Sequence, residues 1–178
     1  MSLFLRFLGL KHNPSKNYPV PFITTMIGMS DGSYAGETFE TNSIPPIWKD
    51  QVFSIQKPDP TASLQILIKS SSILMSKEII GRCEIRIESF PVDQLVLEWV
   101  PIIPVREGIP KMFILLMAHF VNEIPPFKAQ PGALCTQTET IPFDPKDNFY
   151  LPDEMVPKDL NSEQQNGSVL SEILEKLS

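Results

Sequence analysis

The chain has 178 residues, 42% of them hydrophobic, and it carries 18 prolines and a net charge of −6. This is enough apolar material for one core of about 100–130 residues, and so many prolines argue against long helices. The acidic balance lacks the basic footprint that nucleic-acid binders need, which excludes that class of partner.

The negative charge is concentrated in the last third of the chain. Residues 1–123 hold 11 Lys and Arg against 12 Asp and Glu, a net of −1, whereas residues 124–178 hold 4 against 9, a net of −5.

Two cysteines, Cys83 and Cys135, are too few for a disulfide framework and favour free thiols in a reducing compartment. Neither a membrane span nor a signal peptide is predicted, because Arg6 interrupts the apolar start and no apolar run reaches 18 residues. We therefore expect a cytoplasmic protein.

Short segments of strand-like composition recur along the first two thirds of the chain. They are separated by turn residues such as the Asp-Gly pair at 31–32. The predicted strands, in chain order, are residues 3–8, 21–29, 38–43, 48–56, 63–69, 82–88, 94–102 and 111–120. This pattern predicts an all-β fold, an eight-stranded antiparallel β-sandwich over residues 1–123. The last run, "KMFILLMAHF", also fits a buried helix, but its length and flanking prolines favour a strand.

From residue 124 the composition changes. Seven prolines between 125 and 157, without sustained periodicity, predict an extended acidic tail over 124–167. Apolar residues then recur at helical spacing in the final segment, 168–178; they are Val169, Leu170, Ile173, Leu174 and Leu177. A helix of about eleven residues is marginal in water, so we expect this apolar stripe to lie on another surface.

Four stretches resemble, in order and spacing, the sequence pattern of C2 domains. They are "PVPFITTMIG", "NSIPPIWKDQVFSI", "LQILIKSSSILMSKEIIGRCEIRI" and "EWVPIIPVREGIPKMFILLM". In the second stretch Pro45 occupies a place where the family has Asn. The resemblance covers residues 2–121 and implies the same eight-stranded sandwich.

The resemblance also locates a degenerate metal site. Calcium-binding members clamp the ions with five aspartates, and the corresponding places here are Pro14, Val20, Ser70, Ser72 and Glu78. Because hard cations need several carboxylate oxygens, one acid in five predicts no calcium binding and no other metal or cofactor. The serine-rich segment is then expected to be a solvated loop over 70–78.

Catalysis has little support in the sequence. His12 and His119 lie far apart, no Ser/His/Asp or Cys/His set is legible, and Glu98 is expected on the surface. We therefore predict no catalytic residues.

Two functions remain open. The first is a non-catalytic, calcium-independent scaffold in a larger assembly, by analogy a cytoskeletal or ciliary one, in which the tail and the terminal helix dock on partner proteins. The predicted tail anchors are Phe127, Phe143, Phe149 and Tyr150, although composition alone also fits a disordered spacer.

The alternative is a peripheral membrane adaptor that inserts the apolar tip Ile73, Leu74 and Met75, but the scattered basic residues disfavour it. The partner's identity and the oligomeric state stay open.

Overall fold

A computed structural model describes residues 1–12, 22–41, 46–48, 51–72, 75–122, 130–135 and 140–142. Strands dominate these residues, and one 3₁₀ turn, η1 (Ile87–Ser89), interrupts them. Within the described ranges, no helix has the length and apolar character needed to cross a membrane.

The described strands form a single hydrogen-bonded path with two short additions. In chain order they are β1 (Ser2–His12), β2 (Phe22–Met29), β3 (Ala35–Glu37), β4 (Phe53–Gln56), β5 (Ser63–Ser72), β6 (Met75–Arg86), β7 (Gln94–Pro104), β8 (Met112–Val121), β9 (Gln130–Gly132) and β10 (Ile141–Pro142). The path runs β3-β2-β5-β6-β7-β8-β1-β4, and its neighbours pair antiparallel. The predicted eight-stranded antiparallel β-sandwich is confirmed.

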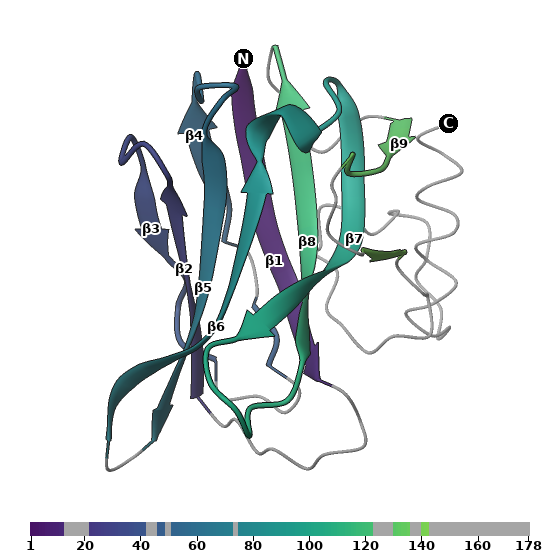
Figure 1. Cartoon of the computed structure of the whole chain (residues 1–178). Helices are drawn as coiled ribbons and strands as arrows, with labels where there is room; N and C mark the ends of the chain where they lie inside the picture. Colours follow the sequence, from purple (N-terminus) through teal and green to yellow (C-terminus); the bar gives the residue numbers. More distant parts are fainter. Residues whose placement is uncertain are drawn as a thin grey trace, which may run out of the picture.

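Two layers face one another across an apolar core (Figure 1). Sheet A contains β4, β1, β8 and β7, and sheet B contains β3, β2, β5 and β6. β7 joins them, because residues 95–102 pair with β8 while its last two, Ile103 and Pro104, pair with Arg82 and Gly81 of β6. The core is filled by alternate side chains of both sheets, such as Leu5, Val100 and Ile66.

The hairpin that begins sheet B differs from its prediction. A strand over 38–43 is wrong, because β3 lies earlier, at Ala35–Glu37, and the later segment makes only the isolated Ile23–Thr41 bridge. The cause is a tight turn: the N–H of Gly32 donates to Met29 O, and Gly32 has φ of +74°. Since glycine adopts that conformation without a steric penalty, the chain reverses within four residues.

Part of the predicted acidic tail adds to sheet A. β9 pairs parallel with Gln94–Val96, and β10 pairs antiparallel with Glu98 and Trp99. Glu98 is buried, not exposed as expected, and its Oε1 accepts from the N–H of Leu134 at 3.1 Å. The terminal helix predicted over 168–178 lies outside the described residues.

Gly81 occupies the place where β6 meets both β5 and the end of β7. A Cβ atom at this position would clash with Ile102 Cγ2 and lie 3.0 Å from Met112 Cε. Both neighbours are buried in the core, so they have little room to move. The junction between the sheets therefore depends on a residue without a side chain.

Replacing Gly81 by alanine should lower the free energy of unfolding by about 1–3 kcal/mol through overpacking. Gly28→Ala on β2 is the matched control, because the nearest atom to its Cβ, Tyr34 O, lies at an ordinary 3.7 Å. Urea unfolding, followed by circular dichroism, measures the unfolding midpoint of each variant. Equal midpoints for the two variants would contradict this packing.

Candidate functional site

The β5–β6 hairpin continues through the predicted serine break. Ser70 pairs with Glu78 and Ser72 with Met75, so the expectation of a loop over 70–78 is wrong. The serines stay in the strand because β5 is paired on both edges, and Ser70 and Ser71 also pair with β2. Pairing on both sides outweighs the weak strand preference of serine.

Several predicted site residues lie outside the described part of the chain. Two of them, Pro14 and Val20, are degenerate calcium positions, and two more, Ile73 and Leu74, belong to the proposed membrane tip. The third residue of that tip, Met75, is described and begins β6. The predicted partner anchors also fall there; they are Phe127, Phe143, Phe149, Tyr150, Val169, Leu170, Ile173, Leu174 and Leu177. All of these assignments stay predictions.

Glu78, the one acid at the degenerate calcium positions, forms an ion pair. Arg106, in the turn after β7, reaches it with both guanidinium nitrogens: Nη1 lies 2.5 Å from Oε1, and Nη2 lies 3.2 Å from Oε2. This two-point geometry is the preferred match between arginine and a carboxylate. Among the described residues, no three His, Cys, Asp or Glu side chains come together as a metal site would require. The retained acid is thus engaged by a cation of the protein itself.

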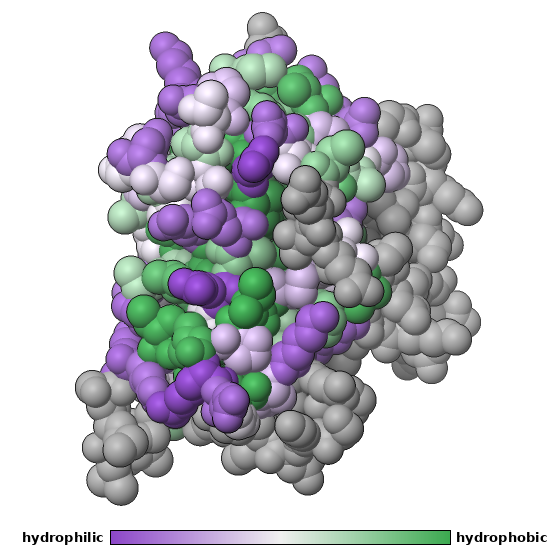
Figure 2. All heavy atoms as spheres, viewed as in Figure 1, coloured by the Kyte–Doolittle hydropathy of each residue, from purple (hydrophilic) through white to green (hydrophobic). Residues whose placement is uncertain are grey.

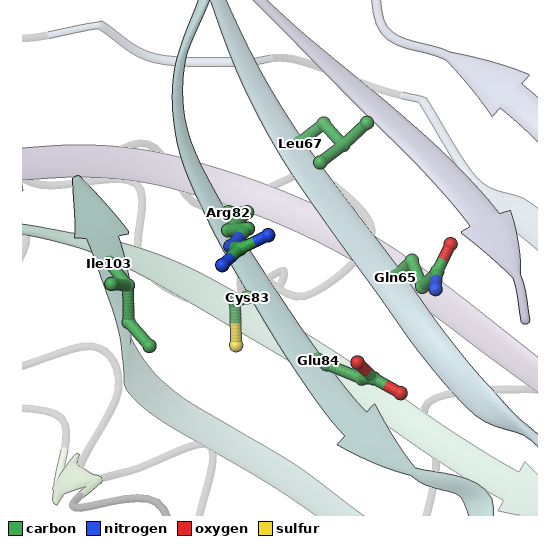
Figure 3. Close-up of a pocket in the computed structure, with 6 residues that line it drawn as sticks. All are labelled: Gln65, Leu67, Arg82, Cys83, Glu84 and Ile103. Carbon is green, nitrogen blue, oxygen red and sulfur yellow. The ribbon is translucent and has the colours of Figure 1, made fainter. Parts of the chain in front are cut away.

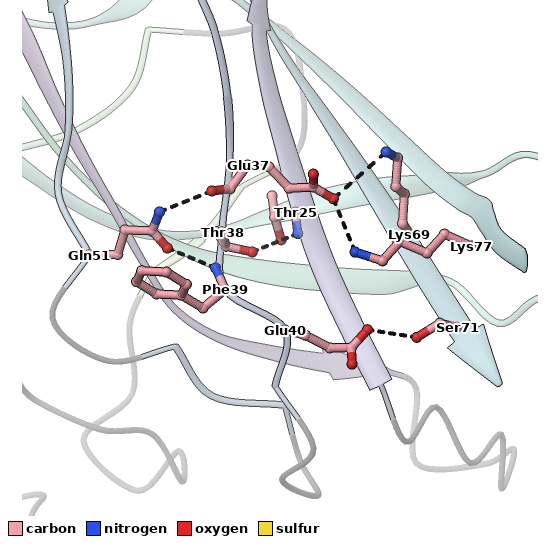
Figure 4. Close-up of polar contacts among 9 residues, drawn as sticks. All are labelled: Thr25, Glu37, Thr38, Phe39, Glu40, Gln51, Lys69, Ser71 and Lys77. Carbon is pink, nitrogen blue, oxygen red and sulfur yellow. Dashed lines mark hydrogen bonds and ion pairs between the residues drawn. The ribbon is translucent and has the colours of Figure 1, made fainter. Parts of the chain in front are cut away.

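Sheet B carries a polar network next to this hairpin (Figure 4). Glu37 Oε1 lies 3.7 Å from the Nζ atoms of both Lys69 and Lys77. Ser71 Oγ donates to Glu40 Oε2 at 2.7 Å. The two lysines of the hairpin therefore face one carboxylate of β3, and Ser71 faces a carboxylate of the segment after it.

Gln51 closes the open edge of the sandwich, opposite the junction at β7. Its Nε2 donates to Glu37 O and its Oε1 accepts from the N–H of Phe39, both at 2.9 Å. Gln51 precedes β4 of sheet A, whereas Glu37 and Phe39 belong to the β3 edge of sheet B. One side-chain amide thus bonds backbone groups across the edge, as a paired strand would.

A pocket of about 520 Å³ lies on sheet B, where β6 and β7 separate after their two paired residues. Figure 3 shows its lining, which consists of Gln65, Leu67, Arg82, Cys83, Glu84 and Ile103. Arg82 and Glu84 bring opposite charges to the same side of β6. Burial raises the pKa of the Cys83 thiol to about 12, so the pocket offers no reactive thiolate.

Apolar side chains border this pocket on the outer face of sheet B. We name them the outer patch, and they are Met26, Leu67, Ile79 and Ile103. The register places Met26, Leu67, Arg82 and Ile103 in one row across four strands. Ile103 is 60% exposed and Ile79 is 39% exposed. Figure 2 shows hydrophobic side chains gathered where β2, β5 and β6 come together, bordered by hydrophilic ones.

One feature of the sequence points to this patch. In "SLQILIK", Leu67 stands between Gln65 and Lys69 on the polar face of an alternating strand. One apolar residue on a polar face is common, and the row across four strands becomes visible only once the register is known. Arg106 carried no comparable signal, because its partner Glu78 is distant in the sequence.

The family model described as "C2 domain" matches residues 4–102, more than half of the chain. The chain belongs to the C2 domain family. C2 domains are modules for interaction with lipids or proteins and are typically non-catalytic. No curated protein matches this C2 domain.

Solved structures agree with the family at low sequence identity. A C2 domain of plant Extended Synaptotagmin 1 superposes with a TM-score of 0.56 at 11% identity, covering 70% of this chain and 96% of that one. Human GIVD cytosolic phospholipase A2 gives a TM-score of 0.51 at 12% identity, covering 68% of this chain but 16% of the phospholipase. These likenesses support the fold alone.

The two thiols of this C2 domain should react differently. Cys135 is exposed and Cys83 is buried, and a thiol with a pKa near 12 holds a thiolate fraction of about 10⁻⁴ at pH 8. An aromatic disulfide reagent should therefore label one thiol per native chain and two after denaturation. Mass spectrometry should assign the native label to Cys135, and rapid native labelling of Cys83 would contradict its burial.

Proposed function

We propose that this C2 domain is a non-catalytic, calcium-independent protein–protein interaction module that serves as a scaffold component of a larger assembly. The outer patch carries the proposal, because it is apolar, partly exposed and joined to a pocket with two opposite charges. Apolar groups with a polar rim are typical of protein interfaces.

The chemistry of the hairpin supports the proposed calcium independence. Ca²⁺ takes about six to eight oxygen ligands, several of them carboxylates. Ser70 and Ser72 supply hydroxyl groups in place of carboxylates. Glu78 is held by Arg106, so calcium would have to displace a guanidinium to gain its one carboxylate.

Charge pairing favours a protein partner over an anionic membrane. Attraction to anionic lipid requires a cluster of unneutralised cations. The described ion pairs around the outer patch are Lys69–Glu37, Lys77–Glu37, Arg86–Glu88 and Arg106–Glu78. Four cations thus face three carboxylates, because Lys69 and Lys77 share Glu37, and Arg82 lines the same pocket as Glu84. The apolar side chains of the patch remain for contact.

The tail and the terminal helix extend the proposal to a second region of contact. Their apolar residues are predicted anchors for a partner protein, and the cytoskeletal or ciliary setting and cytoplasmic location are proposals that rest on the sequence. The small size and the acidic tail are compatible with them.

A peripheral membrane adaptor is the second candidate. It is favoured by the hairpin itself, because Ile73 and Leu74 fall between the strand ends Ser72 and Met75. Two apolar residues at such a connection could enter a bilayer without a metal ion.

Ile103→Asp should reduce recovery of the partner by about tenfold or more, as expected when an exposed apolar contact is lost. Val52→Asp is the matched control, because Val52 is 40% exposed but precedes β4, away from the outer patch. Affinity capture of the native complex, followed by crosslinking mass spectrometry, compares the two with the parent chain. Equal recovery from both variants would contradict a partner site at the patch.

Calcium should change neither thermal stability nor lipid binding. We expect the same melting temperature in calcium and in chelator, and no flotation with phosphatidylserine vesicles in either. Flotation that is lost on Ile73→Asp and Leu74→Asp would instead support the membrane adaptor, and a calcium-dependent rise in melting temperature would contradict the proposed function.

A further inference from the structure

One edge of β6 loses its neighbouring strand partway along its length. β5 pairs with β6 from Met75 to Arg86, whereas β7 pairs with Gly81 and Arg82 alone. Beyond Arg82, the register therefore gives residues 83–86 a partner strand on the β5 side only. We name the other side of these four residues the open edge. An unpaired strand edge presents backbone N–H and C=O groups that can pair with another chain.

The pairing with β5 identifies which backbone groups the open edge presents. The N–H of Ile87 donates to Ala62 O, the pair that follows Ser63–Arg86 in the β5–β6 register. The backbone groups of an antiparallel strand point alternately to its two neighbours. Odd-numbered residues from 83 to 87 therefore face β5, and the N–H and C=O groups of Glu84 and Arg86 point out from the open edge. The described residues place no strand beside these groups.

Two features of β7 prevent it from serving this edge. The β6–β7 register, if continued, would place Pro101 opposite Glu84 and Trp99 opposite Arg86. Proline has no N–H to donate to a ladder, and Trp99 already pairs with Ile141 of β10. The edge of β7 is thus used by another strand, and β6 is left open next to it.

The outer patch and its pocket adjoin the open edge. The pocket of about 520 Å³ lies where β6 and β7 separate, and Figure 3 shows Leu67 and Ile103 on the two sides of Arg82. Arg86 is ion-paired, because its Nη1 lies 3.1 Å from Glu88 Oε1. Arg82 and Glu84, by contrast, are both exposed and form no ion pair within the described ranges. They offer one cation and one anion to the side chains of an added strand.

We propose that an extended segment of a partner protein adds to β6 as a further strand and pairs with Glu84 and Arg86. In such strand addition, main-chain hydrogen bonds give affinity and side-chain pockets give specificity. The fitting segment has an apolar residue for the pocket beside Leu67 and Ile103, a basic residue opposite Glu84 and an acidic residue near Arg82. Strand addition rests on the proposed function, because it assumes a protein partner at the outer patch.

The bounds of the open edge favour a single short segment over a second copy of this chain. The β6–β7 pair at Arg82 limits one end, and η1 limits the other. Two copies paired through β6 would bring both sets of bounds together, whereas one extended segment has to fit only one set. Short additions already occur on the neighbouring strand, because β9 has three residues, β10 has two, and both pair with β7.

Hydrogen exchange of the full-length chain tests the open edge. In the isolated chain, the amides of Glu84 and Arg86 should exchange at least about a hundredfold faster than those of Cys83 and Ile85, which face β5. In the native complex, captured by an affinity tag on the full-length chain, the amides of Glu84 and Arg86 should become protected. Protection of both in the isolated monomer would show that the edge is already paired, and protection in a dimer found by sedimentation would make a second copy the occupant. Either result would overturn the proposal.

A proline at position 84 tests the backbone contact itself. Glu84→Pro removes the N–H that points from the open edge and leaves the bonds to β5, so recovery of the partner should fall by about tenfold. Glu84→Ala is the matched control, because it keeps the N–H and loses only the carboxylate, and recovery should fall by about threefold or less. Circular dichroism checks the fold of both. If Glu84→Pro fails to fold, the exchange of the Glu84 and Arg86 amides in the parent complex decides.

Ile103→Asp separates strand addition from the proposed function. Loss of the partner by Ile103→Asp, together with retention by Glu84→Pro and unchanged exchange of the two amides in the complex, would mean that the partner contacts the face of the outer patch. Strand addition would then be wrong and the proposed function would stand. Full retention of the partner by Ile103→Asp and Glu84→Pro alike would contradict both.

Discussion

The architecture depends on β7 (Gln94–Pro104), the strand that belongs to both sheets. Along one edge it pairs with β8, and along the other with β9, β10 and finally two residues of β6. The crossing from sheet A to sheet B requires close approach of β6, which Gly81 permits because a side chain there would occupy the space of Ile102. Gln51 holds the opposite edge with a side-chain amide. One edge is closed by a shared strand and the other by a pair of hydrogen bonds.

This closure gives the molecule two unequal outer surfaces. On sheet B, a row of apolar residues is partly exposed among ion-paired lysines, arginines and glutamates. On sheet A, Trp99 and its neighbours are buried although they point away from the core. Antiparallel sheets commonly leave one face in water, and the outer face of sheet B fits that rule. We therefore propose the outer face of sheet B, and not that of sheet A, as the surface for partners.

Much of the fold could be predicted from the sequence, because alternation in stretches such as residues 63–69 fixes which side chains enter the core. Pairing partners could not be predicted. The serines of β5 looked like a strand end, yet they are held by β2 and β6 together. Glu98 was expected on the surface, yet it is buried. Its carboxylate accepts a hydrogen bond from the N–H of Leu134, which lies in a proline-rich segment without periodicity. The position of the degenerate calcium site was visible in the sequence, but the ion pair that engages Glu78 depends on Arg106, which only the fold brings near.

Hydroxyl-radical footprinting of the full-length chain, read by mass spectrometry, tests most directly whether the outer faces of sheets A and B differ in solvent exposure. Methionine and tryptophan are reactive probes, and this C2 domain places one set on each face: Met26 on sheet B, and Met117 and Trp99 on sheet A. We predict that Met26 and the exposed Ile103 are oxidised in the native chain, while Met117 and Trp99 are protected until it unfolds. Oxidation of Met117 and Trp99 as fast as that of Met26 would contradict the burial of these two side chains on sheet A.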